Sequence, residues 1–188
     1  MRIVVSGTHA SGKSTLISDF VLSHPEFAVL PDPFEFVDEA GDSPSAGMFA
    51  AQLRVAADRL LDDELGEQVI AERGPVDFLA YILALAELSG APASDELVER
   101  ATARTAAALA RVDVLVVLPL TASDAIHVGP DEDPDLRDAM NDILLELVDD
   151  PDLVGDRVTV VEITGDPATR MAALEAVAGL GPRLSGSR

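Results

Sequence analysis

The sequence predicts an α/β protein with one parallel β-sheet that is covered by helices on both faces. Short apolar stretches rich in β-branched residues alternate along the chain with longer amphipathic stretches, and this alternation is typical of parallel sheets. The chain has 188 residues, of which 48% are hydrophobic, which suits one domain with a full core. We therefore expect a single three-layer αβα domain over residues 1–180 and a disordered tail over residues 181–188.

Five apolar stretches are predicted to be buried strands. They are Arg2–Ser6, Phe27–Leu30, Gln68–Glu72, Asp113–Leu118 and Val158–Ile163. The helical patterns between and after them span Lys13–Ser23, Ser45–Leu65, Pro75–Leu88, Ser94–Arg111, Asp135–Val148 and Pro167–Gly179. Loops that follow parallel strands gather at the carboxyl edge of the sheet, where ligands bind.

The first of these loops has a complete phosphate-binding pattern, G-x-x-x-x-G-K-[ST], between a strand and a helix. Lys13, the only lysine of the chain, is expected to reach the β- and γ-phosphates of ATP, and the hydroxyl of Ser14 to bind Mg²⁺. Gly7 and Gly12 are expected where a side chain would block the phosphates or where φ is positive. The predicted ATP-binding residues are Gly7, Thr8, His9, Ala10, Ser11, Gly12, Lys13, Ser14 and Thr15.

The absence of a second lysine limits the class of phosphate-loop protein to which this chain can belong. A guanine-reading motif needs a second lysine, so we expect ATP to be preferred over GTP. The remaining classes are a small kinase and a simple NTPase of similar fold.

The residues at the end of the third predicted strand favour the kinase. Together with the phosphate loop, the segment Ala71–Phe78 (Ala-Glu-Arg-Gly-Pro-Val-Asp-Phe) resembles the nucleoside-kinase-like group of P-loop proteins, which includes ribosylnicotinamide, deoxynucleoside and thymidylate kinases. The resemblance implies strand order 2-3-1-4-5, with Glu72 ordering Mg²⁺ and Arg73 contacting phosphoryl oxygens or the acceptor. From the residues alone, Gly74, Pro75 and Asp77 also fit a simple helix start.

Candidate acceptor residues follow the second predicted strand and lie in the next helix. Asp32 matches the position at which deoxynucleoside kinases resembling this chain carry a base toward the acceptor hydroxyl, although an Asp between two prolines also suits a surface turn. Glu35 is the reserve candidate. In the predicted helix, Phe49 could stack on a ring and Gln52 could read an amide or base edge; the alternatives are a core Phe49 and a surface Gln52.

The predicted lid, at about residues 121–137, departs from the resembling kinases because residues 121–135 contain no arginine. Arg137 follows one turn into a helix, where it could reach the γ-phosphate or pair with Asp133. An arginine-poor lid leaves a second function open, namely an ATP-binding regulatory module or slow NTPase without a small-molecule acceptor.

The net charge and the composition of the chain argue against several kinds of binding partner. The formal net charge is −21 without a basic cluster, which argues against nucleic acid and anionic membranes. There is no cysteine and no signal-peptide pattern, so we expect a cytoplasmic protein, with a homodimer left open. The expected function is ATP- and Mg²⁺-dependent phosphoryl transfer to a hydroxyl of a small molecule, a nucleoside or ribosyl-nicotinamide-like compound being the leading acceptor class.

Overall fold

The computed structural model describes residues 1–36, 44–120 and 133–181. Within these ranges the chain forms one five-stranded parallel sheet of order β2-β3-β1-β4-β5, which confirms the predicted class and strand order. The strands are β1 (Arg2–Ser6), β2 (Ala28–Leu30), β3 (Val69–Glu72), β4 (Val114–Val117) and β5 (Thr159–Glu162). All but β1 are shorter than predicted by one residue at one or both ends, where the ladder pairing stops.

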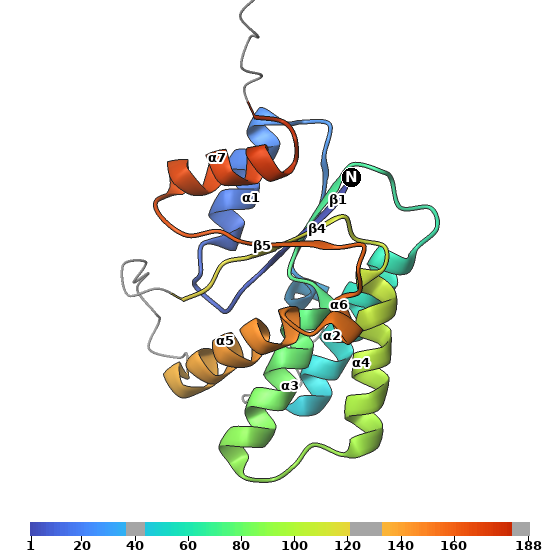
Figure 1. Cartoon of the computed structure of the whole chain (residues 1–188). Helices are drawn as coiled ribbons and strands as arrows, with labels where there is room; N and C mark the ends of the chain where they lie inside the picture. Colours follow the sequence, from blue (N-terminus) through green and yellow to red (C-terminus); the bar gives the residue numbers. More distant parts are fainter. Residues whose placement is uncertain (37–43, 121–132, 182–188) are drawn as a thin grey trace, which may run out of the picture.

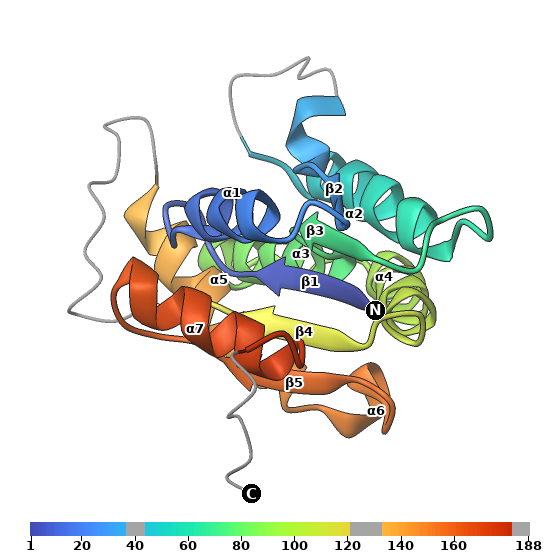
Figure 2. The same cartoon turned by 90° about the horizontal axis from the view of Figure 1, so that it is seen from above.

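Helices cover both faces of this sheet (Figures 1 and 2). One face carries α1 (Lys13–Ser23) and α7 (Pro167–Val177). The other carries α2 (Ala46–Leu61), α3 (Pro75–Ser89), α4 (Asp95–Leu109), α5 (Pro134–Val148) and the short α6 (Pro151–Val154).

The core is correspondingly divided by the central strand β1. Its alternate side chains point to opposite faces, so that Ile3 and Val5 pack with Phe20 of α1 and Leu174 of α7. Val4 instead joins the larger apolar cluster of α2 to α5. The central strands β1, β3 and β4 are buried on both faces and read as continuous apolar runs, as predicted. The prediction of buried strands is wrong for β2 and β5, which are partly exposed because they form the two edges of the sheet.

Some predicted helix bounds are wrong for local reasons. Helix α2 ends at Leu61 and not at Leu65, because the Asp62 side chain accepts the N–H of Glu64 and turns the chain. Ser45 and Ser94, predicted as first helical residues, are N-caps whose side chains accept the N–H of Met48 and Leu97.

Other helices differ from the prediction in the residues at which they begin or end. Three helices end at other residues than predicted: α3 ends at Ser89 and not at Leu88, α4 at Leu109 and not at Arg111, and α7 at Val177 and not at Gly179. Helix α5 begins at Pro134 and not at Asp135, because Asp133 is its N-cap. Helix α6 and the 3-10 helix η1 (Pro33–Phe36) were not predicted, because four residues are too few to show a helical period.

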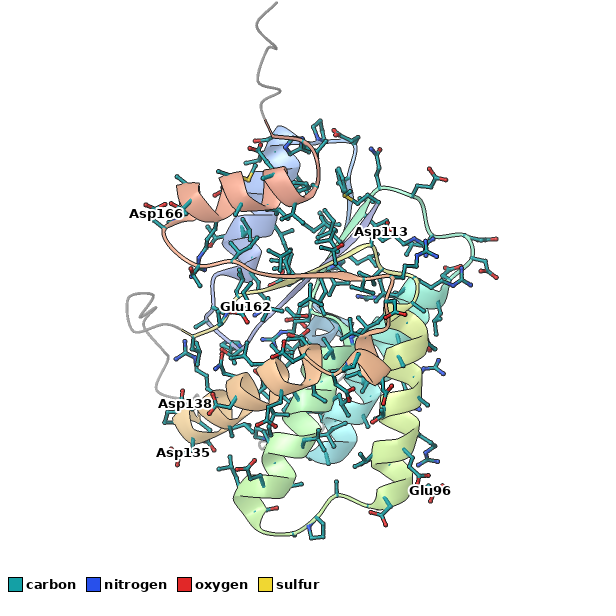
Figure 3. The ribbon with its side chains drawn as sticks, viewed as in Figure 1. Glu96, Asp113, Asp135, Asp138, Glu162 and Asp166 are labelled. Atoms are coloured by element: carbon teal, nitrogen blue, oxygen red, sulfur yellow. The ribbon has the colours of Figure 1, made fainter. Side chains whose placement is uncertain are left out.

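Two predicted segments fall outside the described residues, namely 121–132 of the lid and 182–188 of the tail. In the ranges that are described, no helix is long and apolar enough to cross a membrane. Acidic side chains are spread over several elements of the surface (Figure 3). Examples are Glu96, Asp113, Asp135, Asp138, Glu162 and Asp166.

Candidate nucleotide and acceptor site

The phosphate loop joins β1 to α1 at the carboxyl edge of the sheet, and its glycines are required by the backbone. Gly7 has φ +152°, and a Cβ there would lie 2.8 Å from the carbonyl oxygen of Leu118. Gly12, the N-cap of α1, has φ 89°. Both positions are therefore unfavourable for any residue with a side chain, as the sequence predicted.

Lys13 begins α1 and is folded against the loop. It is 4% exposed, and its Nζ donates to the carbonyl of Thr8 at 2.6 Å and to Ser11 Oγ at 3.3 Å. Burial, followed by the charge of Arg73, lowers the pKa of Lys13 to about 7. A bound phosphate would favour the charged ammonium, so this geometry suits an anionic ligand.

Arg137 and Arg73 both donate hydrogen bonds to carbonyl groups of the same loop. Arg137, in the first turn of α5, donates from Nε to the carbonyl of His9 at 3.0 Å and from a terminal nitrogen to that of Ala10 at 3.5 Å. Arg73 reaches the carbonyl of Gly7 at 3.5 Å. The predicted residue Arg137 therefore lies at the phosphate loop, although the segment before it lies outside the described residues.

The predicted Mg²⁺ ligands are neighbours. Ser14 Oγ donates to Glu72 Oε1 at 2.6 Å, so that a hydroxyl and a carboxylate from α1 and β3 meet at the solvent-exposed side of the loop. These are hard oxygen donors of the kind that Mg²⁺ prefers. The described residues contain no group of three or more histidine or acidic side chains that could hold a metal ion, so phosphate oxygens and water would have to complete the coordination.

Asp77 is a site residue that sequence reasoning treated only as part of a helix start. It is fully buried and accepts three hydrogen bonds, from Ser6 Oγ at 2.6 Å, Gly7 N at 2.8 Å and Gly74 N at 2.8 Å. Burial raises the pKa of Asp77, against the opposing charge of Arg73. The carboxylate both caps α3 and anchors the first residue of the phosphate loop.

Asp32 and Arg73 form an ion pair beside the phosphate loop. Arg73 Nε lies 2.7 Å from Asp32 Oδ2, and the side chains are 7% and 20% exposed. Burial lowers the pKa of Arg73, but Tyr81 and Asp32 outweigh it and raise the pKa above its ordinary value, so Arg73 stays cationic.

The backbone around this pair is also constrained. Arg73 has φ 62°, a left-handed conformation that is unusual outside glycine and common at functional sites. On the other side of the pair, Arg59 donates to the carbonyl of Pro31 at 2.8 Å, and the N–H of Phe34 donates to Asp32 Oδ1 at 3.0 Å. No sequence signal had singled out Arg59, because a donor to a loop carbonyl follows no motif. The Glu35 side chain lies outside the described part of the protein.

Aromatic rings connect Arg73 to helix α2. Phe49 stacks on Tyr81 with centroids 4.6 Å apart and planes 11° from parallel, and the Arg73 guanidinium carbon lies 5.6 Å from the Tyr81 ring centre. The N–H of His9 points to the Tyr81 hydroxyl at 3.3 Å, and His9 Nδ1 lies 3.5 Å from Arg73. Phe49 is 7% exposed, so in this structure it packs as a core residue at the edge of the site.

Gln52 lies one turn after Phe49 on the same side of α2. It is 1% exposed, and neither its Oε1 nor its Nε2 has a hydrogen-bond partner among the described residues. The alternative of a surface Gln52 is therefore wrong. A buried amide without partners costs free energy, which makes it a candidate contact for a ligand that supplies them.

The fold and the phosphate loop together define the class: the chain has the fold of the nucleoside-kinase-like P-loop proteins. Among solved structures, deoxyadenosine kinase from M. mycoides with bound dATP superposes with a TM-score of 0.70 at 14% identity, over 95% of this chain and 100% of that one. Thymidylate kinase from Candida albicans gives 0.66 at 16% identity, over 95% and 90% of the two chains.

A third structure with this fold is the NadR protein in complex with NR, with a TM-score of 0.65 at 18% identity. This chain matches over 98% of its length but covers 52% of NadR. No family model matches the sequence, and no curated protein matches it either. At these identities the likeness establishes the fold, and the activity has to be argued from the site.

Proposed function

We propose that this protein transfers the γ-phosphoryl group of ATP, with Mg²⁺, to a hydroxyl group of a small molecule. The observation that carries the proposal is the Asp32–Arg73 ion pair of 2.7 Å, whose arginine also reaches the carbonyl of Gly7. The Arg73 side chain contacts both the Asp32 carboxylate and the phosphate loop, and so holds this carboxylate beside the loop. Phosphoryl transfer needs positioning, neutralised charge and a carboxylate near the attacking hydroxyl, and this pair supplies all three.

In this proposal each residue has a separate task. The phosphate loop and Lys13 hold the β- and γ-phosphates, and Ser14 and Glu72 hold Mg²⁺, which neutralises phosphate charge when bound. The acceptor oxygen forms a bond to the γ-phosphorus while its proton passes to the Asp32 carboxylate. The bond between that phosphorus and the bridging oxygen breaks, and ADP leaves. Arg73, and Arg137 if it turns inward, stabilise the charge of the transferring group.

The acceptor that this arrangement favours is a nucleoside or a ribosyl-nicotinamide-like compound. The amide of Gln52, which lacks partners among the described residues, offers the N–H donors of Nε2 and the acceptor Oε1, which match a carboxamide or the edge of a nucleobase. The names of structures with the same fold agree with this class, since one is a deoxyadenosine kinase and another was solved with NR. The cytoplasm remains the expected location, because ATP and Mg²⁺ are plentiful there.

The test is ADP release with and without a panel of nucleosides and other small alcohols. Asp32→Asn removes the base while the phosphate loop is untouched, so ATP affinity should change little and transfer should fall by roughly two to four orders of magnitude. Arg73→Lys keeps the charge but loses the two-sided contact, and it should also lower kcat. Asp63→Asn, which removes an exposed carboxylate paired with Arg111, is the matched control and should have no effect.

Rates that do not depend on any acceptor, in the wild type and in both site variants, would refute the kinase and leave the regulatory module or slow NTPase. ATP binding itself is measured separately by calorimetry, so a protein that fails to bind ATP is recognised before any acceptor is tried.

A further inference from the structure

Arg170 is a buried arginine of α7 that connects two loops at the carboxyl edge of the sheet. It is 6% exposed. Its Nε donates to the carbonyl of Gly165, in the loop between β5 and α7, at 2.8 Å. Its NH1 donates to the carbonyl of Ser11, in the phosphate loop, at 2.6 Å. One guanidinium thus joins segments that lie more than 150 residues apart in the sequence.

The contact with Ser11 fixes a peptide group that a phosphate would meet. In a planar trans peptide the C=O and the next N–H point in opposite directions. By holding the carbonyl of Ser11, Arg170 therefore sets the direction of the Gly12 N–H. The flanking backbone needs such support, because Ala10 has φ 51° and Gly12 has φ 89°. Arg137 holds the carbonyls of His9 and Ala10 from the other side, so consecutive carbonyls of the loop are fixed by arginines of two different helices.

The contact with Gly165 lies on the side of the site where the base of a nucleotide would be. This step rests on the proposed function. The terminal phosphate has to face Asp32 and Arg73, which follow β2 and β3. The rest of the nucleotide then leaves the phosphate loop toward the opposite half of the sheet, formed by β4 and β5, where the segment Ile163–Asp166 follows the last strand.

We propose that Arg170 is a positioning residue that couples the base side of the nucleotide site to the phosphate loop. A base that rests against the loop after β5 orders the carbonyl of Gly165, and Arg170 transmits that order to Ser11 and the Gly12 N–H. A ligand with phosphates alone cannot use this connection. Arg170 should therefore matter more for ATP than for inorganic tripolyphosphate.

The experiment is calorimetric binding of ATP and of tripolyphosphate, each with Mg²⁺, to the full chain. Arg170→Met keeps the buried stem and removes the hydrogen bonds to Gly165 and Ser11, and it should weaken ATP binding about tenfold or more, as expected for hydrogen bonds from a charged group. Tripolyphosphate binding should weaken by a clearly smaller factor. Arg170→Lys, whose single ammonium cannot span both carbonyls in the way that the planar guanidinium does, should shift the ratio in the same direction. The matched control is Arg157→Met, since the Arg157 side chain is 72% exposed.

Each outcome of the binding experiment either supports or overturns the coupling by Arg170. A fall in the ratio of ATP to tripolyphosphate affinity in the Arg170 variants, but not in Arg157→Met, supports the coupling. Equal losses for both ligands would reduce Arg170 to a support of the phosphate loop, and unchanged affinities would remove it from the site; either result overturns the inference. If Arg170→Met does not fold, Arg170→Lys alone gives the ratio. A wild type that binds tripolyphosphate but not ATP would instead refute the proposed function, and this inference with it.

Discussion

The amide of Gln52 should lower the stability of the protein in the absence of an acceptor. Gln52 is 1% exposed, and both its polar atoms lack partners in the described part of the chain. Gln52→Met replaces the amide by an apolar group of similar length and should raise the free energy of unfolding. Mutational data place the cost of a buried, unpaired amide at about 1–3 kcal/mol. Since methionine fills the space imperfectly, the expected gain is about 1–2 kcal/mol.

The assay is thermal and denaturant unfolding without ligand. For a domain of this size 1 kcal/mol corresponds to about 2–4 °C, so Tm should rise by roughly 2–8 °C. Gln68→Met is the matched control, because Gln68 is exposed and precedes β3; its Tm should stay within about 1 °C. In the presence of an accepted nucleoside the order should reverse, because only the wild type gains binding free energy through the amide.

The stability measurement is independent of the identity of the acceptor. An unchanged or lower Tm for Gln52→Met would mean that the amide is already satisfied, for instance by water, and the argument for Gln52 as an acceptor contact would lose its physical basis. A higher Tm together with unchanged transfer would show that the amide is unsatisfied but unused.

Two further perturbations test the phosphate loop and its anchor. Asp77→Ala leaves three donors without an acceptor and should lower the free energy of unfolding by about 3 kcal/mol or more, whereas Asp95→Ala, at an exposed first helical turn, should cost less than about 1 kcal/mol. Denaturant unfolding measures both, and equal losses would contradict the role of Asp77. Lys13→Met should weaken ATP binding at least about tenfold in calorimetry, while the free energy of unfolding changes by less than about 1 kcal/mol. Equal ATP affinity in the wild type and the variant would contradict the assignment of the phosphate loop.

The fold could be predicted because its signals are local and periodic. The alternation of apolar strands with helices and the phosphate-loop pattern each lie within short windows, and the strand order came from the resemblance that the phosphate loop and Ala71–Phe78 carry. The pairs Ser14–Glu72 and Asp32–Arg73 could be expected to meet, since each residue lies near the carboxyl end of a strand in that order.

What could not be predicted depends on tertiary packing. Asp77 reads as a helix-start residue in sequence, and only the neighbouring β1 shows that its second oxygen holds Gly7. Arg170 and Arg59 bind carbonyl groups, which every residue has, so no pattern in the sequence identifies their partners. The burial of Gln52 was missed for a related reason: a polar residue on an amphipathic helix is usually exposed, and the exceptions are decided by packing.

Three features of the site favour the proposed transfer over the second function that the arginine-poor lid leaves open. A protein that only bound ATP would need the phosphate loop, Lys13 and the Mg²⁺ ligands. It would not need the Asp32–Arg73 ion pair, the left-handed backbone of Arg73 or the buried amide of Gln52, which lacks a partner among the described residues; the left-handed backbone and the unsatisfied amide each cost free energy. These costs are explained, under the proposed function, if a second small molecule contacts these residues. The cations that a lid would bring are partly supplied by Arg73, which follows β3, and by Arg137 of α5, since both reach the phosphate loop; the composition of the lid alone therefore does not argue against transfer.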